Sequence, residues 1–175
     1  GDGEVVLRAY GVTITVTLIG ASLHVLLTAL YAYPLSRRDF PFRNFFVIFI
    51  LITMLFSGGL VPFYLVYTKL LDLRDNLWAL ILPGVIGPFN IFLVRTFFQQ
   101  NIPVEILDSA KLDGAGELRI FTRMILPLSL PVLATIGLFT TIGYWNNWFN
   151  ALLFISDKDL YTLQYIMMQS LLRLQ

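Results

Sequence analysis

Residues 9–33 read AYGVTITVTLIGASLHVLLTALYAY, a run of 25 residues without a charged side chain. A bilayer core of roughly 30 Å needs about 20 helical residues, so this run is long enough to cross a membrane. Three further apolar stretches follow at about 45–67, 77–98 and 126–145, of which the last is barely long enough. No barrel-like alternation is present, so the stretches predict helices, which pair all their backbone groups internally.

The composition also indicates a membrane protein. Of the 175 residues, 57% are hydrophobic and 13% are charged, and the mean hydropathy is +0.76. Soluble domains carry about 25% charged residues, so this chain has too little charge to cover a surface that faces water. We therefore predict one all-α domain over residues 1–175, a polytopic bundle of transmembrane helices in contact with lipid.

Several classes of function are disfavoured by residues that the chain lacks. It has no Cys and a single His, which excludes thiolate catalysis and thiolate metal sites and makes a histidine metal cluster improbable. An intramembrane enzyme would need a catalytic dyad within its spans, and none is evident in this sequence. A proton-driven carrier is expected to have a mid-membrane Asp or Glu, and the four apolar stretches contain none. There is no basic patch for nucleic acid.

The positions of Lys and Arg predict the orientation. Three arginines lie in the connection 36–43, and Lys111, Arg119 and Arg123 lie in the connection 99–127, whereas the other connections are nearly balanced in charge. Positive residues are enriched on the cytoplasmic side, so the loop 99–127 is expected there. The N-terminus is then outside, and we expect the chain to be truncated at both ends.

The apolar stretches are interrupted by Gly and Pro, as at 57–62 and 83–88, the latter followed by Asn90. Such breaks occur along substrate paths, although close helix packing is the more common reason for any one of them. Taken together they favour helices that move against one another. His24 faces either a cavity or a neighbouring helix, and Arg95 is expected to reach the headgroups.

The loop from Asn101 reads NIPVEILDSAKLDGAGELRIFTRMILPLSLP. It predicts a short helix with Pro103 at its first position and a stop at Asp113-Gly114, where Gly114 takes the left-handed conformation. A second helix is expected at about 116–125. The first helix is amphipathic, with a strip at Ile106, Leu107 and Ala110. It offers a small knob to a soluble partner, unless the loop is an ordinary connection.

This loop resembles the E-A-A loop of the membrane subunits of binding-protein-dependent ABC importers. That pattern is Glu-Ala-Ala, three residues, Gly, nine residues and Ile-x-Leu-Pro. The matching positions keep this spacing and are Asp108-Ser109-Ala110, Gly114 and Met124-Ile125-Leu126-Pro127. The departures are mild: Asp108 replaces Glu, Ser109 replaces Ala and Met124 replaces Ile.

A second stretch, YWNNWFNALLFISDKDLYTL at 144–163, is similar to the carbohydrate-uptake branch of these importers. Within that branch the chain most resembles the maltose-type G subunit and its relatives for oligosaccharides. The resemblance implies the type I permease fold. Members usually have six spans, so the chain is expected to be a fragment with about four of them. A permease for another cargo, such as amino acids, phosphonate or a peptide, stays open.

The resemblance implies that the loop is a coupling helix that docks on a cytoplasmic ATPase. The residues expected to transmit the motion are Glu105, Asp108, Ser109, Ala110, Gly114, Leu126 and Pro127. The implied partners are a second permease, two cytoplasmic ATP-binding subunits and an extracellular solute-binding protein, in a bacterial or archaeal plasma membrane. ATP is used by the partner, and this chain binds no cofactor. Consistently, it has no phosphate loop of the G-x-x-x-x-G-K-[ST] type and is not itself an enzyme.

Polar and aromatic residues give candidates for the substrate path or for contact with the binding protein. They are Asn90, Trp145, Asn146, Asn147, Trp148 and Asn150. On this interpretation the tryptophans stack on a sugar ring and the asparagines bond hydroxyls. Anchoring at the membrane interface explains the tryptophans equally well.

Overall fold

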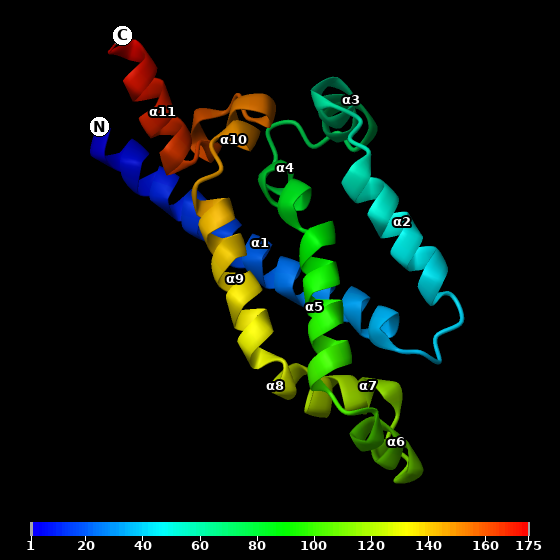
Figure 1. The fold of residues 1–175 in the computed structure, drawn as a ribbon. Helices are drawn as coiled ribbons and strands as arrows, with labels where there is room; N and C mark the ends of the chain where they lie inside the picture. Colours follow the sequence, from blue (N-terminus) through cyan, green and yellow to red (C-terminus); the bar gives the residue numbers. More distant parts are fainter. Residues whose placement is uncertain (1, 175) are drawn as a thin grey trace. The chain divides into compact units, whose positions relative to one another are not determined.

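The computed structural model describes residues 2–174, and every regular element in this range is helical (Figure 1). The all-α class is thereby confirmed. In chain order the elements are α1 (Asp2–Ser36), α2 (Arg43–Leu55), α3 (Leu60–Leu65), η1 (Val66–Leu70), α4 (Leu77–Ile81), η2 (Leu82–Gly84), α5 (Pro88–Asn101), α6 (Val104–Leu112), α7 (Glu117–Ile120), η3 (Phe121–Ile125), α8 (Leu126–Leu128), α9 (Leu130–Trp145), α10 (Phe149–Phe154), η4 (Lys158–Leu160) and α11 (Leu163–Arg173). Elements η1 and η3 are π-helical turns, and η2 and η4 are 3₁₀ turns.

Within the described residues, Gly3–Ser36 of α1 is long and apolar enough to cross a membrane by itself. Three pairs of consecutive helical segments meet the same criterion only when each bent pair is counted as one span, which allows up to four crossings. They are Arg43–Leu55 with Leu60–Leu70, Leu77–Gly84 with Pro88–Asn101, and Glu117–Leu128 with Leu130–Trp145. The four stretches expected from the sequence fall on these helices, and the crossing itself stays a prediction.

The breaks inside these pairs lie at the Gly and Pro clusters. Gly59 precedes α3 with a φ of +85°, in the left-handed region that glycine adopts without steric cost. Pro88 begins α5, where its missing N–H leaves no bond unmade. Ser129 separates α8 from α9, two residues before Pro131, which cannot donate to the carbonyl of Pro127.

The chain forms two compact units. Unit 1 comprises Gly1–His24, Gly58–Ile86 and Leu138–Gln175, and unit 2 comprises Val25–Ser57 and Gly87–Gly137. The core of unit 1 is built around Phe154, which is 1% exposed and contacts the rings of Phe63, Tyr64 and Tyr67. These residues come from α3, η1 and α10, so aromatic packing joins segments that are far apart in the sequence.

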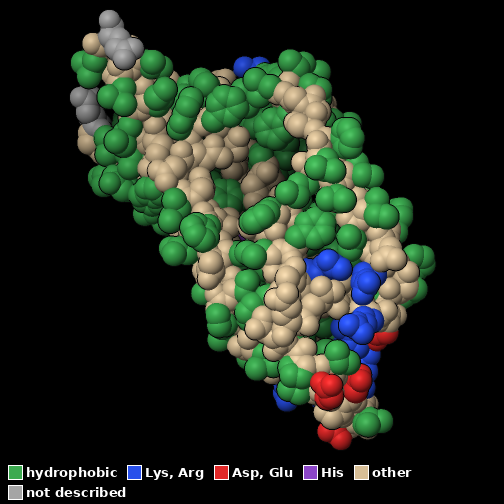
Figure 2. Space-filling view, viewed as in Figure 1, with side chains coloured by type: hydrophobic (Ala, Val, Ile, Leu, Met, Phe, Trp, Pro, Cys, Tyr) green, Lys and Arg blue, Asp and Glu red, His purple; other side chains and the backbone are tan. Residues whose placement is uncertain are grey.

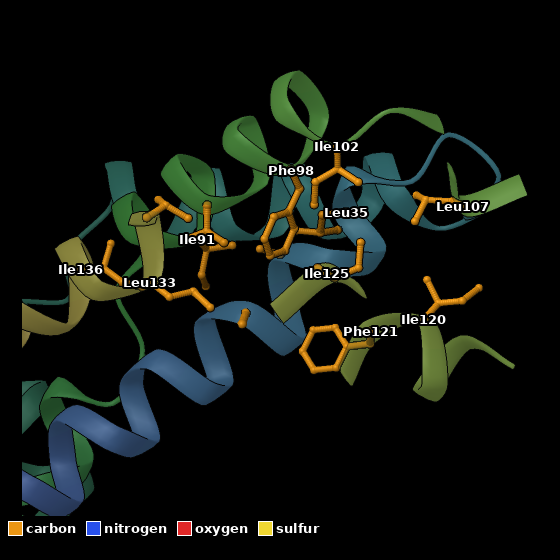
Figure 3. Close-up of a cluster of buried hydrophobic side chains, with 14 of the residues drawn as sticks. Leu35, Ile91, Phe98, Ile102, Leu107, Ile120, Phe121, Ile125, Leu133 and Ile136 are labelled. Atoms are coloured by element: carbon orange, nitrogen blue, oxygen red, sulfur yellow. The ribbon is translucent and has the colours of Figure 1, made fainter. Parts of the chain in front are cut away.

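The core of unit 2 gathers apolar side chains from α1, α2, α5, α6, α7, η3 and α9 (Figure 3). The fully or nearly buried members include Leu35, Ile91, Phe98, Leu107, Ile120, Phe121, Ile125 and Ile136. The segment 103–125 is therefore packed against α1, α5 and α9 through its apolar face. That packing gives the polar loop a defined position within unit 2.

A glycine–tyrosine joint, formed by Gly20, Ile81, Gly84 and Tyr144, lies in unit 1. Tyr144 is 6% exposed, and its hydroxyl donates to the carbonyl oxygen of Ile81 over 2.7 Å. Its ring lies so close to two glycines that an added Cβ would be 2.5 Å from it at Gly20 and 2.8 Å from its hydroxyl at Gly84. His24 Nδ1 donates to the carbonyl oxygen of Gly84 over 2.8 Å. Two side chains thus satisfy the carbonyl of the last residue of α4 and that of the last residue of η2.

Candidate functional site

Helix α6 begins one residue later than the sequence predicts, with Pro103 as its N-cap residue. Leu107 is buried and Ala110 packs against the core of unit 2, whereas Ile106 is 38% exposed. The apolar strip is therefore narrower than expected. Glu105 lies in the first turn, where a negative charge is favourable to the helix dipole.

A left-handed glycine ends α6, as the sequence predicts. Gly114 has a φ of +79°, its N–H donates to the carbonyl oxygen of Lys111, and the N–H of Ala115 donates to that of Ala110. These two bonds are the Schellman pattern, which satisfies carbonyls at a helix end. A Cβ at Gly114 would meet no atom within 4 Å. Only the backbone conformation, and not crowding, opposes a side chain there.

The face of this loop away from the core carries both charges and apolar side chains. Glu105, Asp108 and Ser109 are exposed. Leu112 is 89% exposed and Leu118 is 75% exposed, one on each side of the Gly114 turn. We call these two exposed leucines, which flank the turn, the knob; exposed apolar side chains of this size are typical of a surface that another protein covers.

Elements α7, η3 and α8 connect this knob to α9. The N–H of Leu126 donates to Phe121 O, which closes the π turn η3. The turn precedes Pro127, whose ring would clash with the carbonyl four residues earlier in a regular α-helix. The sequence placed the junction with the next span at Leu126-Pro127. The break between helices lies at Ser129 instead, where the axis bends by 76°.

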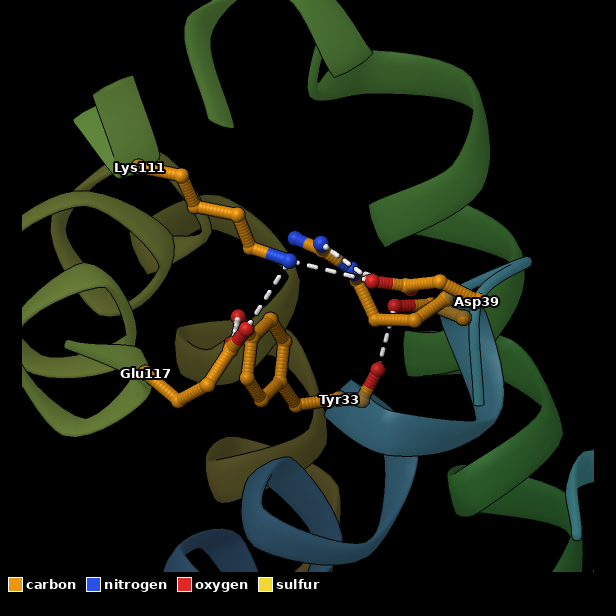
Figure 4. Close-up of polar contacts among 6 residues, drawn as sticks. Tyr33, Asp39, Lys111 and Glu117 are labelled. Atoms are coloured by element: carbon orange, nitrogen blue, oxygen red, sulfur yellow. Dashed lines mark hydrogen bonds and ion pairs between the residues drawn. The ribbon is translucent and has the colours of Figure 1, made fainter. Parts of the chain in front are cut away.

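A polar ring, formed by Tyr33, Arg37, Asp39, Lys111 and Glu117, surrounds the start of this connection (Figure 4). The Lys111 ammonium lies 3.0 Å from carboxylate oxygens of both Asp39 and Glu117. The Tyr33 hydroxyl donates to Glu117 over 2.5 Å. Arg37 donates two bonds of 3.1 Å to Asp39, and its guanidinium carbon lies 5.9 Å from the centre of the Tyr33 ring.

These contacts shift the titration of the groups in the ring. The Arg37 side chain, followed by Lys111, holds the pKa of the Asp39 carboxyl well below its usual value. The hydrogen bond from Tyr33 and the Lys111 ammonium lower the pKa of Glu117. The same two carboxylates, Asp39 first, raise the pKa of Lys111. Both carboxylates and the ammonium are therefore charged at neutral pH.

Two cavities in unit 2 adjoin the polar ring. One of about 540 Å³ contains Arg37, Arg38 and Arg43 in its lining, together with Asp108 and the apolar residue Leu107. The other, of about 340 Å³, is lined by Tyr33, Pro34, Arg37, Asp39, Phe40, Pro41 and Glu117. Around α6 in Figure 2, Lys, Arg, Asp and Glu side chains gather on the visible face. The described residues contain no group of three or more His, Cys, Asp or Glu that could hold a metal ion.

The residues predicted for cargo or binding-protein contact differ in accessibility. In unit 1, Asn150 is 7% exposed, and its N–H donates to the side-chain oxygen of Asn147, which makes these two residues a local cap. Trp145 is half-buried beside the ring of Tyr10. Asn146 is exposed and donates to the carbonyl oxygen of Ile142.

The last two candidates do not project freely. Trp148 packs against the core of unit 1 and lies edge-on to Phe149. Asn90 belongs to α5 in unit 2 and is half-buried. Among the six candidates, Trp145 and Asn146 are thus the neighbours best placed to meet another molecule.

Residues 25–175 match the family described as "Binding-protein-dependent transport system inner membrane component". This chain belongs to that family. It is 46% identical to Protein LplC of Bacillus subtilis (strain 168) over 163 residues, which are 93% of this chain and 55% of the relative. It is 43% identical to the polygalacturonan/rhamnogalacturonan transport system permease protein YtcP of the same organism, over 95% of this chain and 57% of the relative.

The solved structure of an ABC importer supports the same family assignment at the level of the fold. The structure is described as a bacterial ABC transporter involved in the import of the acidic polysaccharide alginate. It matches 98% of this chain and 61% of its own with a TM-score of 0.92 and 29% identity. The chain spans about half the length of the curated relatives it matches. The permease fold of the family is thereby established for these residues.

Sequence reasoning missed one anchor of this permease-family chain. Asp75 has a φ of +54°, and its carboxylate accepts the N–H groups of Ser156 and Asp157, in the second case over 2.8 Å. Those bonds, with the one from Ser156 first, lower the pKa of Asp75. The Asn and Asp side chains tolerate left-handed backbone, so the Arg74-Asp75-Asn76 run was the available signal. The two N–H groups that Asp75 binds lie 81 and 82 positions away, and nothing in the local sequence indicates them.

Proposed function

We propose that this chain is part of the permease subunit of an ATP-driven importer and lines half of a path for a sugar or oligosaccharide. Its α6–α8 segment lies on the cytoplasmic side and couples the path to an ATPase. One observation carries the proposal: an exposed knob, Leu112 and Leu118, stands on a Schellman turn whose other face is packed into the core of unit 2. A push on the knob therefore reaches the helices that this core contains.

The proposed assembly has four kinds of component. They are this permease, a second permease, a pair of cytoplasmic subunits that bind and hydrolyse ATP, and an extracellular solute-binding protein. Lipid surrounds the spans. Trp145 and Asn146 are proposed to face the cargo or the binding protein. Glu105, Asp108, Ser109, Ala110 and Gly114 are proposed to meet or shape the contact with the ATPase, and Leu126 and Pro127 pass its movement to α9.

The names of two relatives suggest the first cargo to test. YtcP is named for polygalacturonan and rhamnogalacturonan, and the solved transporter for the import of the acidic polysaccharide alginate. We therefore propose an oligosaccharide with carboxylate groups ahead of a neutral one. Uptake of labelled galacturonate trimer and of maltotriose should be compared in proteoliposomes that contain the full-length permease and its partners. Uptake that persists without ATP would instead favour an ion-coupled carrier.

The coupling role is tested at Gly114. A left-handed backbone costs a residue with a side chain about 1–2 kcal/mol, and a β-branched residue tolerates it worst. Gly114→Val should abolish the stimulation of ATP hydrolysis by loaded binding protein in the assembled importer. Gly116→Val is the matched control, because Gly116 is extended with a φ of −74° and a Cβ there also meets nothing within 4 Å. Equal stimulation in both variants would contradict the proposal.

A further inference from the structure

Lys111 lies at the centre of a contact that the coupling loop makes with a distant part of the chain. Its ammonium is 3.0 Å from Asp39, which follows α1, and 3.0 Å from Glu117, which begins α7. Residues 111 and 39 are 72 positions apart. Figure 4 shows the ammonium between the two carboxylates. Lys111 is therefore the one member of the polar ring that contacts both the α1 side and the α7 side while itself belonging to α6.

The ring has a second connection between the same elements. Tyr33, in the last turn of α1, donates to the other carboxylate oxygen of Glu117, and its ring lies 5.4 Å from that of Phe121 in η3. Arg37 connects Asp39 to Tyr33, because it donates two hydrogen bonds to the Asp39 carboxylate and lies over the face of the Tyr33 aromatic ring. Each carboxylate thus has two partners, so neither can turn away without breaking a bond to another element.

The strength of these contacts decides what they can do. The side chains of Asp39 and Glu117 are both 58% exposed, and ion pairs at such exposure contribute about 0–1 kcal/mol each. The neighbouring buried residues Ile120 and Phe121 contribute far more to holding α7 in the core. The ring is consequently not required for folding. The polar ring instead sets the position of α6 relative to the end of α1, because Lys111 of α6 binds both carboxylates.

We propose that Lys111 is a positioning residue that makes the end of α1 move together with α6 and α7. This inference rests on the proposed coupling function. It adds a route by which movement at α6 reaches α1 through side chains, in addition to the route along the backbone through η3 and α8 to α9. The Asp39 and Glu117 carboxylates are the two attachment points of this route.

The test uses reporters on either side of the ring in the assembled full-length importer. Residues 1–175 contain no Cys, and any Cys elsewhere in the full-length permease or its partner subunits is first replaced by Ser, so a single introduced cysteine carries the only spin label. Val104→Cys reports on α6 and Arg38→Cys reports on the segment after α1, since both positions are exposed. The change in each spectrum on trapping with ATP and vanadate is measured in the parent, in Lys111→Gln and in Lys111→Arg.

In Lys111→Gln the Val104 reporter should still respond, and the response of the Arg38 reporter should fall at least twofold. Lys111→Arg should restore it. Arg119→Gln is the matched control, because Arg119 is exposed on α7 and has no ion pair within residues 2–174. If Lys111→Gln and Arg119→Gln give equal Arg38 responses, the inference is wrong while the proposed function stands.

A second variant guards against a general effect of removing the ammonium. Tyr33→Phe keeps the aromatic side chain of residue 33 against Phe121 and removes only the hydrogen bond to Glu117. It should therefore also reduce the response of the Arg38 reporter, but by less than Lys111→Gln does. A full response in Tyr33→Phe would confine the route to Lys111 and overturn the role given to the whole ring. If neither reporter responds to ATP in the parent, the proposed coupling function fails as well.

Discussion

The glycine–tyrosine joint of unit 1 and the polar ring of unit 2 both connect α1 to distant segments, but by different physical means. In the joint, one aromatic ring is enclosed by two glycines and its hydroxyl is paired with a carbonyl. In the polar ring, five polar side chains meet at the surface. A buried joint has no alternative partner, whereas exposed charges exchange readily with water.

The comparison indicates how α1 can be both fixed and adjustable. Where α1 contacts Tyr144, any change leaves a clash or an unpaired carbonyl, so that contact sets the structure of unit 1. Where Asp39, in the segment after α1, contacts Lys111, the contact can break and form again within about 1 kcal/mol. Mutations in the joint should therefore act on stability, and mutations in the ring should act on coupling.

The largest expected effect is at Gly20. A Cβ there would lie 2.5–2.8 Å from three atoms of the Tyr144 ring, which cannot move without losing its bond to Ile81. Gly20→Ala should lower the free energy of unfolding by about 1–3 kcal/mol, the usual range for overpacking. Thermal unfolding of the purified full-length protein in detergent measures this. Gly11→Ala, on the same helix with nothing within 4 Å, should raise or keep the midpoint. Equal midpoints would remove the steric basis of the joint.

A smaller effect is expected for Tyr144→Phe. The aromatic ring remains, and only the hydrogen bond to the Ile81 carbonyl is lost, which should cost about 1 kcal/mol. Tyr10→Phe is a suitable control, because Tyr10 is exposed and its ring lies beside that of Trp145. The same unfolding measurement applies. A loss as large as that of Gly20→Ala would show that the hydroxyl, and not the fit between glycines, dominates the joint.

Stability should change still less for Lys111→Gln. Its two ion pairs are solvent-exposed, so the free energy of unfolding should fall by less than about 1 kcal/mol even though the response of the Arg38 reporter falls. Chemical denaturation of the purified protein, with Arg119→Gln alongside, measures the difference. A loss above 2 kcal/mol would mean that the polar ring holds the fold as the joint does.

No effect of pH is expected between pH 8 and pH 6. The contacts lower the pKa of Asp39 and of Glu117 below the ordinary carboxyl value of about 4. Both carboxyls therefore stay ionised throughout this range, and the ion pairs are lost only as the pH falls below the ordinary carboxyl value. The difference in Arg38 reporter response between the parent and Lys111→Gln should be the same at both pH values. A difference that shrinks by pH 6 would point to a group other than these carboxyls.

Local features of the loop were predictable because neighbouring residues decide them. The left-handed Gly114 follows from the Asp113-Gly114 stop signal directly after an amphipathic helix, and the burial of Leu107 follows from its place on the apolar strip. The bend at Ser129 was misplaced by two or three residues, because Pro127 fits within a helix once the π turn η3 precedes it. The proline that breaks the helix is Pro131.

Contacts between distant residues were not predictable from the chain alone. Nothing near Lys111 indicates Asp39 as its partner, and nothing near Gly20 indicates a tyrosine 124 positions later. Polar residues near Trp145 were interpreted as sugar contacts by resemblance. Two of them, Asn147 and Asn150, bond to each other, since asparagine caps its own neighbourhood as readily as it binds a ligand.

The π turn η3 has a consequence for the spacing of the loop. Each helical residue contributes about 100° of rotation and 1.5 Å of rise, and a π turn accommodates one residue more than an α turn. Nine residues separate Gly114 from Met124, and η3 begins at Phe121 within that interval and continues to Ile125. Because η3 holds one residue more than a regular turn, removing one residue there would convert it to a regular turn and leave the angle between the knob and α8 nearly unchanged. Removing a second residue would leave nothing to absorb the loss and would rotate the knob by about 100° around the axis relative to α8. The π turn therefore sets how far the length of this interval can vary before the knob changes its direction.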